Sequence, residues 1–150
     1  MSAVDPLTLP LSALRDALTA CATGLYREEA AVALLIAHDV WPRRGEFLQS
    51  CVEVDDDGWT RDGTATLAAV DWDAARRLTE TGPASSSEAA ILRLAAALAD
   101  EETGSLLVRL DAANLALVLD AVAHCAGWHE RGLAHQVTGL VDRSRVGGGS

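Results

Sequence analysis

The chain has 150 residues, and 49% of them are apolar, which is enough for one domain with a buried core. Its net charge at pH 7 is −10, from 22 acidic and 12 basic residues, and every basic residue is an arginine. This charge repels a phosphate backbone, so we expect no direct binding to nucleic acid. Aromatic residues make up only 4% of the chain, and a core of Leu, Val and Ala favours packed helices over strands.

The three cysteines, Cys21, Cys51 and Cys125, are odd in number and widely spaced, unlike the dense, even set of a disulfide-stapled secreted protein. The first residues, MSAVDPLTLPLSALRD, contain no basic segment followed by a long apolar run, so no signal peptide is expected. The longest apolar run, residues 30–37, is far shorter than the roughly twenty residues that cross a bilayer. We expect a cytoplasmic protein without membrane attachment.

A helix over residues 11–22 is predicted by apolar residues that recur at steps of three and four: Leu11, Leu14, Leu18, Cys21 and Leu25. This pattern makes Cys21 a small core residue. The segment REEAAVALLIAHDVWP, residues 27–42, predicts a central helix that Pro42 stops. A short helix is expected within RRGEFLQSCV, residues 43–52.

Residues 52–70 predict a β-hairpin or an irregular loop, because Val52 and Val54 alternate and two Asp-Gly turn signals follow. Asp71 is expected to cap a helix that ends at Gly82. Ser85 and Glu88 have the spacing of a capping box ahead of another helix. The expected buried stripe of that helix is Ile91, Leu94, Ala95 and Leu98.

A short turn of helix is expected at residues 105–110, and Asp111 is expected to cap the last strong helix. Its expected buried stripe is Leu115, Val118, Leu119 and Val122. We therefore predict a mainly α fold, a single compact bundle of five or six helices with a small β-hairpin around residues 52–70. The domain is expected to span 11–127, with 1–10 an N-terminal extension and 128–150 a weakly amphipathic tail ending in a linker-like Gly/Ser segment.

The segment HCAGWHERGLAH, residues 124–135, raises the question of a metal site. Neighbouring side chains on a helix diverge by about 100°, so His124 and Cys125 cannot share a metal. Cys125 and His129 have usable spacing, but Gly127 between them is a natural helix terminator. No CxxC or HExxH motif is present to anchor zinc. We expect Cys125 to be a core residue and no metal or other cofactor to be bound.

The acidic segment EVDDDGWTRDGT, residues 53–64, approximates the first half of a calcium loop. Thr64 stands where such a loop needs a bidentate Glu, so an acidic solvated turn is the simpler interpretation. No GxSxG, GxGxxG or phosphate loop occurs, and helix capping accounts for the serines at 85–87. These absences favour a protein that is not an enzyme, and they leave open a catalytic triad assembled only in space, which a sequence does not reveal.

Four runs resemble a group of small uncharacterised proteins from high-GC actinobacterial genomes: GLYREEAAVALLIAHDVWPRRGEFL, AAVDWDAA, SSSEAAILRLAAALAD and LDAANLALVLDAVAHCAG. Proteins of that group have an IAH-like segment followed by arginines, an IDW-A-A segment, an SSGE-like cap and a last helix ending near HASG. The resemblance spans about residues 11–127. It implies a shared fold, with no established activity and no catalytic residues to transfer.

The leading functional prediction is a protein-interaction or accessory module that works through its surface. Trp and Arg are enriched at the energetic anchors of interfaces, and the predicted partner-binding residues are Trp41, Arg43, Arg44, Asp55, Asp56, Asp57 and Trp59. Local packing is the competing explanation for both tryptophans. A first alternative is a metal- or thiol-dependent protein that uses Cys125, His129 and His135. A second is an acidic mimic that occupies a nucleic-acid site of a partner, which requires one acidic face made of Asp55, Asp56, Asp57, Glu101 and Glu102.

Overall fold

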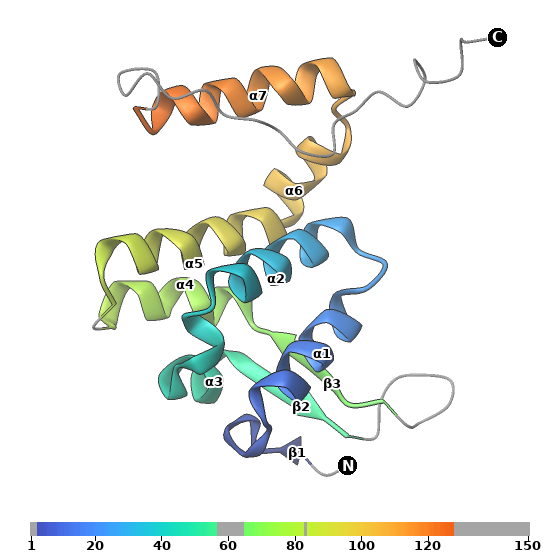
Figure 1. Ribbon diagram of the computed structural model, residues 1–150, viewed down its shortest axis with the longest axis vertical. Helices are drawn as coiled ribbons and strands as arrows, with labels where there is room; N and C mark the ends of the chain where they lie inside the picture. The colour runs from blue at the N-terminus through green and yellow to red at the C-terminus, as the bar shows by residue number, and fades with distance from the viewer. Residues whose placement is uncertain (1–2, 57–64, 83, 128–150) are drawn as a thin grey trace, which may run out of the picture. The chain divides into compact units, whose positions relative to one another are not determined.

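The computed structural model describes residues 3–56, 65–82 and 84–127 (Figure 1). The chain divides into two compact units, Met1–Ser105 and Leu106–Ser150. The described residues contain seven α-helices and one three-stranded antiparallel sheet, so the mainly helical fold with a hairpin within residues 52–70 is confirmed. The elements in chain order are β1 (Ala3–Val4), η1 (Pro6–Thr8), α1 (Leu11–Ala22), α2 (Tyr26–His38), η2 (Trp41–Arg43), α3 (Gly45–Cys51), β2 (Val52–Asp55), β3 (Leu67–Val70), α4 (Trp72–Thr81), α5 (Ser86–Ala99), α6 (Glu101–Val108) and α7 (Ala112–Cys125).

The sheet has the order β1-β2-β3, and β2 pairs with both neighbours in antiparallel register. Val52 and Val54 are buried while Glu53 between them is exposed, which is the alternation expected of a strand with one covered face. Within the expected N-terminal extension, Ala3–Val4 and Pro6–Thr8 form β1 and η1, and β1 pairs with β2 of the sheet. A two-residue strand contains no period that a sequence pattern can reveal.

The predicted helix caps are confirmed. The side chains of Asp71 and Asp111 accept hydrogen bonds from the backbone of Ala74 and Asn114. Ser85 and Glu88 form the complete capping box of α5. Each cap satisfies backbone N–H groups that the first turn of a helix leaves without partners, so these positions can be predicted locally.

The end of α2 differs from the prediction, because the helix ends at His38 and not at Pro42. Asp39 has a φ of 58°, a left-handed conformation that reverses the chain direction, and Asp tolerates it better than most residues. Its carboxylate forms ion pairs with Arg15 and Arg43. These pairs hold the end of α2 against α1 and the η2 turn.

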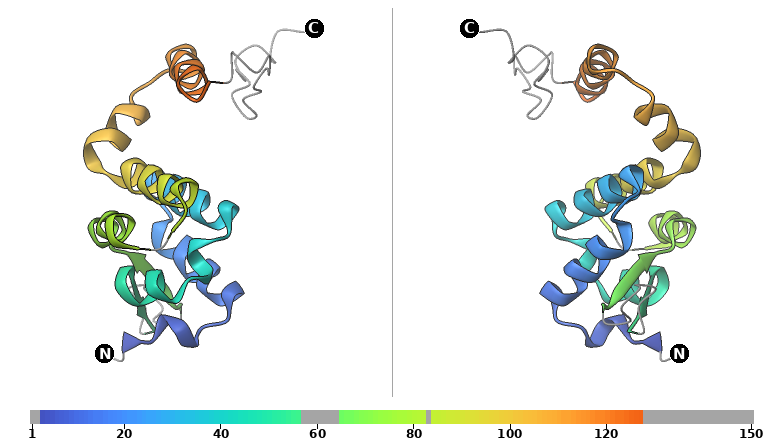
Figure 2. Two further views of the ribbon diagram at one scale, coloured as in Figure 1. Left: turned by 90° about the vertical axis from the view of Figure 1, so that its left-hand side faces the viewer. Right: turned by 90° about the vertical axis from the view of Figure 1, so that its right-hand side faces the viewer.

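The core of the first unit consists of leucines and alanines with Trp41 and Phe47. α2 and α5 lie side by side in all views, and α4 lies beside α5 (Figures 1 and 2). The expected stripe of α5 is wrong in part: Leu94 is 57% exposed, and the buried residues are Leu92, Ala95, Ala96 and Ala99. The buried face is made mainly of alanine, which lets the α2 and α5 backbones approach closely, whereas the prediction favoured the larger side chains.

Gly104 in α6 marks a close approach of three helices. A Cβ at this position would lie 2.4 Å from the carbonyl oxygen of Leu98 and 2.7 Å from Cβ of Arg27. We expect Gly104→Ala to lower the free energy of unfolding by about 1–3 kcal/mol, because the clash outweighs the gain in helix propensity of about 1 kcal/mol. Urea denaturation measures this loss. Gly45→Ala is the matched control, because the added Cβ would lie 3.8 Å from its nearest neighbour, Cδ2 of Leu7. Its free energy of unfolding is expected to stay equal or rise slightly.

Candidate functional site

Trp41, a predicted partner-binding residue, is a core residue with 1% of its surface exposed. Its ring centroid lies 5.9 Å from that of Phe47, and its indole N–H donates to the carbonyl oxygen of Glu88 at 3.0 Å. The Arg44 guanidinium lies 5.0 Å from the centroid of the same ring and pairs with the Glu88 carboxylate at 2.7 Å. Trp41 and Arg44 therefore join η2 to the first turn of α5, and the indole is not available to a partner.

Arg43 lies on the surface of η2, with 55% of its side chain exposed. Its guanidinium donates to the Asp39 carboxylate at 2.9 Å, and Arg15 contacts the other oxygen of that carboxylate. Hydrogen bonds from Arg43 and then Arg15 lower the pKa of Asp39 below its ordinary value. Of the two arginines predicted to bind a partner, only Arg43 is exposed. Its guanidinium is already paired with the Asp39 carboxylate of the same chain.

The acidic segment lies at the end of β2. Asp55 is partly buried in the central strand, and Asp56 is exposed and accepts a hydrogen bond from the Thr66 hydroxyl. Asp57 and Trp59 lie outside the described residues, so their role as contacts stays a prediction. The acidic mimic requires these carboxylates to share a face with Glu101 and Glu102. In Figure 1 the end of β2 lies near the N-terminus, whereas α6 begins at the far end of the first unit, beyond α5.

The cysteines differ from their predicted burial. Cys51 is buried, and burial and then the nearby Asp71 charge raise the pKa of its thiol to about 11. Cys21 is exposed at the last turn of α1 although β3 lies beside it, and Cys125 is exposed in α7, in which no described residue is buried. Both were expected in the core, and this expectation is wrong.

A metal site finds no support in the part of the chain that the structure describes. No group of three or more His, Cys, Asp or Glu side chains within it has an arrangement that could hold an ion. His129 and His135, the other ligands of the alternative, lie outside the described residues, so that alternative stays a prediction. No described helix is long and apolar enough to cross a bilayer.

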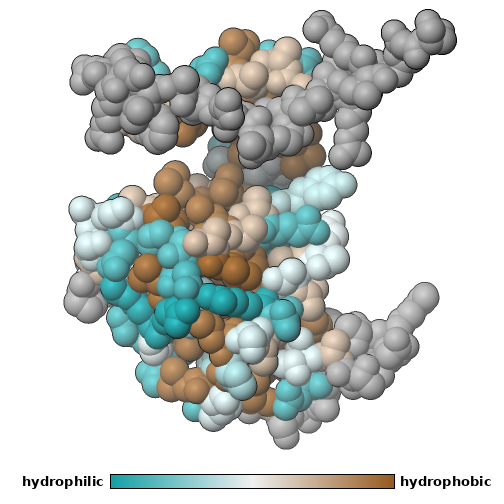
Figure 3. All heavy atoms as spheres, in the orientation of Figure 1, coloured by the Kyte–Doolittle hydropathy of each residue, from teal (hydrophilic) through white to brown (hydrophobic). Residues whose placement is uncertain are grey.

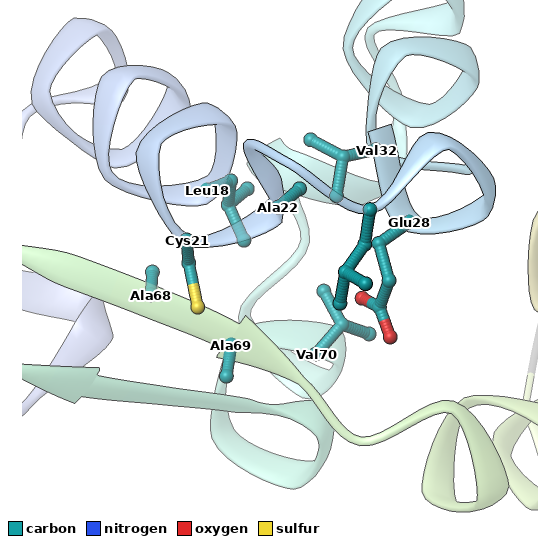
Figure 4. Close-up of a pocket in the computed structure, with 9 residues that line it drawn as sticks. Leu18, Cys21, Ala22, Glu28, Val32, Ala68, Ala69 and Val70 are labelled. Atoms are coloured by element: carbon teal, nitrogen blue, oxygen red, sulfur yellow. The ribbon is translucent and has the colours of Figure 1, made fainter. Parts of the chain in front are cut away.

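A pocket that the sequence did not indicate lies between the end of α1, the start of α2 and β3 (Figure 4). Its walls are mainly aliphatic, and Glu28 is the one charged residue among those that line it. Leu25 at its margin is 52% exposed. The sequence analysis gave neither Leu25 nor Glu28 a functional role, because the approach of β3 to α1 joins segments more than forty residues apart and leaves no local signal.

The second unit has an unusual surface. None of its described residues, 106–127, is buried. Apolar side chains of α7 reach the surface (Figure 3), among them Val122, which is 60% exposed. The expected buried stripe of α7 is therefore wrong: Leu115, Val118 and Leu119 are half-buried and Val122 is exposed. Comparisons of the chain with protein-family models, with curated proteins and with solved structures find no match.

The Glu88 carboxylate predicts a pH dependence of folding. The hydrogen bond from the Ser85 backbone, and then the Arg44 charge, lower its pKa from the ordinary 4.5. A carboxyl whose pKa is lower in the folded state stabilises the fold above its unfolded pKa, and this contribution is lost as the pH falls toward the folded pKa. We expect Glu88→Gln to make the loss of stability below pH 4.5 shallower. Urea denaturation across acidic pH measures it, and Glu80→Gln, an exposed carboxyl of α4, is the control.

Thiol reactivity tests the placement of the cysteines. Thiol reagents attack the thiolate, so the buried Cys51, with its raised pKa, should be inert in the folded protein. We expect Cys125 to react fastest under native conditions, Cys21 more slowly because burial and then the Glu28 charge raise the pKa of its thiol, and Cys51 only after unfolding. Mass spectrometry of the labelled peptides identifies the sites. Rapid native labelling of Cys51 would contradict the packing of α3 against β2 and α4.

Proposed function

We propose that the protein is a non-enzymatic interaction module whose helix α7 packs into an apolar groove on a partner protein. The observation that supports this proposal is the absence of any buried residue among 106–127, although α7 has the apolar periodicity of a core-facing helix. An isolated helix of about 12–15 residues is marginal in water, and most helices gain their stability from packing an apolar face. α7, with 14 residues, is therefore expected to need a covering surface.

The sequence of α7 defines the face that would be covered. Leu115, Val118, Leu119 and Val122 follow steps of three and four residues and form one stripe, whereas Asn114, Asp120 and His124 lie on the other side. An amphipathic helix with anchors at this spacing is a recurring ligand of hydrophobic grooves in partner proteins. We call this stripe the α7 seam. It replaces the Trp41 turn as the preferred contact surface, because Trp41 is buried.

A cytoplasmic setting belongs to the same proposal. It is supported by the three cysteines, all of which are free thiols and two of which are exposed. The resemblance to small actinobacterial proteins adds no activity, and the proposal does not depend on it.

Paired substitutions on opposite sides of α7 test the proposal. Leu119→Asp places a charge in the seam, and Leu117→Asp places the same charge on the polar side, where Leu117 is 66% exposed. Proximity labelling in the producing organism is expected to lose its specific neighbours with Leu119→Asp and to keep them with Leu117→Asp. A charge buried without a partner costs several kcal/mol, so the loss should be nearly complete.

Two controls make this experiment decisive. Thermal unfolding should show that the first unit is equally stable in both variants, so that lost labelling is not due to unfolding. Light scattering of the purified chain should give a monomer. A dimer that Leu119→Asp dissociates, or one set of neighbours retained by both variants, would contradict a groove on a different protein.

A further inference from the structure

The pocket of the first unit has a volume of about 210 Å³. It lies where α1 ends, α2 begins and β3 passes beneath them (Figure 4). Leu18 and Ala22 from α1, Val32 from α2, and Ala68 and Val70 from β3 form its apolar walls. A cavity of this size accepts a short aliphatic chain and is smaller than the pockets of about 300–1,000 Å³ that hold drug-sized ligands.

One carboxylate lies at the margin of this pocket. Figure 4 shows the Glu28 carboxylate beside Val70, at the opposite end from the Cys21 sulfur. The indole N–H of Trp72 donates to Oε2 of Glu28 at 3.3 Å, and this hydrogen bond fixes the direction of the side chain. Glu28 also belongs to the first turn of α2, where the helix dipole favours a negative charge.

Within the described part of the chain, Glu28 has no arginine partner, in contrast to three other half-buried carboxylates. Asp39, Glu88 and Asp100 each form an ion pair with an arginine at less than 3 Å. Among the described residues no arginine or histidine forms such a pair with Glu28. An unpaired carboxylate next to apolar walls is electrostatically complementary to a cation that carries an aliphatic chain.

The thiol at the other end of the pocket does not supply a reaction. Burial, and then the charge of Glu28, raise the pKa of Cys21 above its ordinary value. A thiol is nucleophilic only as the thiolate, so Cys21 is a neutral, weakly polar wall at neutral pH. The pocket therefore has the features of a binding site and lacks those of a thiol active site.

We propose that this pocket binds a primary ammonium group carried on a short alkyl chain. The chain packs between α1 and β3, and the ammonium donates to the Glu28 carboxylate at the margin. Leu25, which is 52% exposed at the same margin, covers part of the bound chain. This site belongs to the first unit and is independent of the α7 seam. The ammonium has two sources, a free alkylamine and the lysine side chain of a peptide.

Titration of the ¹⁵N-labelled full chain with n-butylammonium tests the site. We expect shifts of the amide signals of residues that line the pocket, and about tenfold weaker binding for Glu28→Gln, which loses one charge-assisted hydrogen bond at a partly exposed position. Glu53→Gln is the matched control, because Glu53 is an exposed carboxylate on the other face of the sheet. It should leave the affinity unchanged.

Two further probes separate the remaining outcomes. N-acetyl-lysine amide presents the same ammonium and chain from a peptide backbone, and tighter binding than n-butylammonium assigns the site to a lysine side chain. Weaker binding assigns it to a free amine. n-Butanol has the same chain without the charge and should bind at least tenfold more weakly. Equal binding of n-butanol, an equal effect of Glu28→Gln and Glu53→Gln, or no shifts at the pocket would overturn the proposal.

Discussion

The first unit depends on the burial of Trp41 against the first turn of α5. The indole is the largest fully buried side chain of the described core. Its N–H needs an acceptor inside the core, and the carbonyl oxygen of Glu88 accepts this hydrogen bond. The Glu88 side chain closes the capping box and pairs with Arg44, which in turn covers the indole face. One residue of α5 therefore satisfies a helix end, an arginine and a tryptophan, and it fixes two segments 47 positions apart in the chain.

Features governed by neighbouring residues were predictable from the sequence. The bounds of α1, the Asp71, Ser85 and Asp111 caps and the β2–β3 hairpin all depend on periods or hydrogen bonds within a few residues. Features governed by distant partners were not predictable. Leu94 belongs to the apolar pattern of α5, yet the face that meets α2 is the alanine face one position away. Cys21 likewise follows the stripe of α1 but lies beyond the part that the core covers.

The same distinction explains why the candidate sites were missed. The pattern of α7 is as regular as that of a core helix, and only the structure shows that no residue of its seam is fully buried. Glu28 lies in the first turn of α2, where the helix dipole favours its charge. Its second property, a position at the margin of an apolar pocket, arises only when β3 approaches α1 and Trp72 turns its N–H toward the carboxylate.

Charge pairing separates structural from functional side chains in this protein. Arg15, Arg44 and Arg76 each neutralise a carboxylate that helps to end or begin a helix, so these groups are explained by the fold. Glu28 is half-buried as these carboxylates are, but among the described residues it has no arginine partner, and its carboxylate accepts only the indole N–H of Trp72 beside aliphatic walls. The α7 seam also lacks a complete cover, since Leu115, Val118 and Leu119 are half-buried, Val122 is exposed, and none of them belongs to the described core. Apolar surface left in water lowers stability, and a carboxylate beside apolar walls is complementary to a cation. A binding partner for each is therefore the physically consistent explanation.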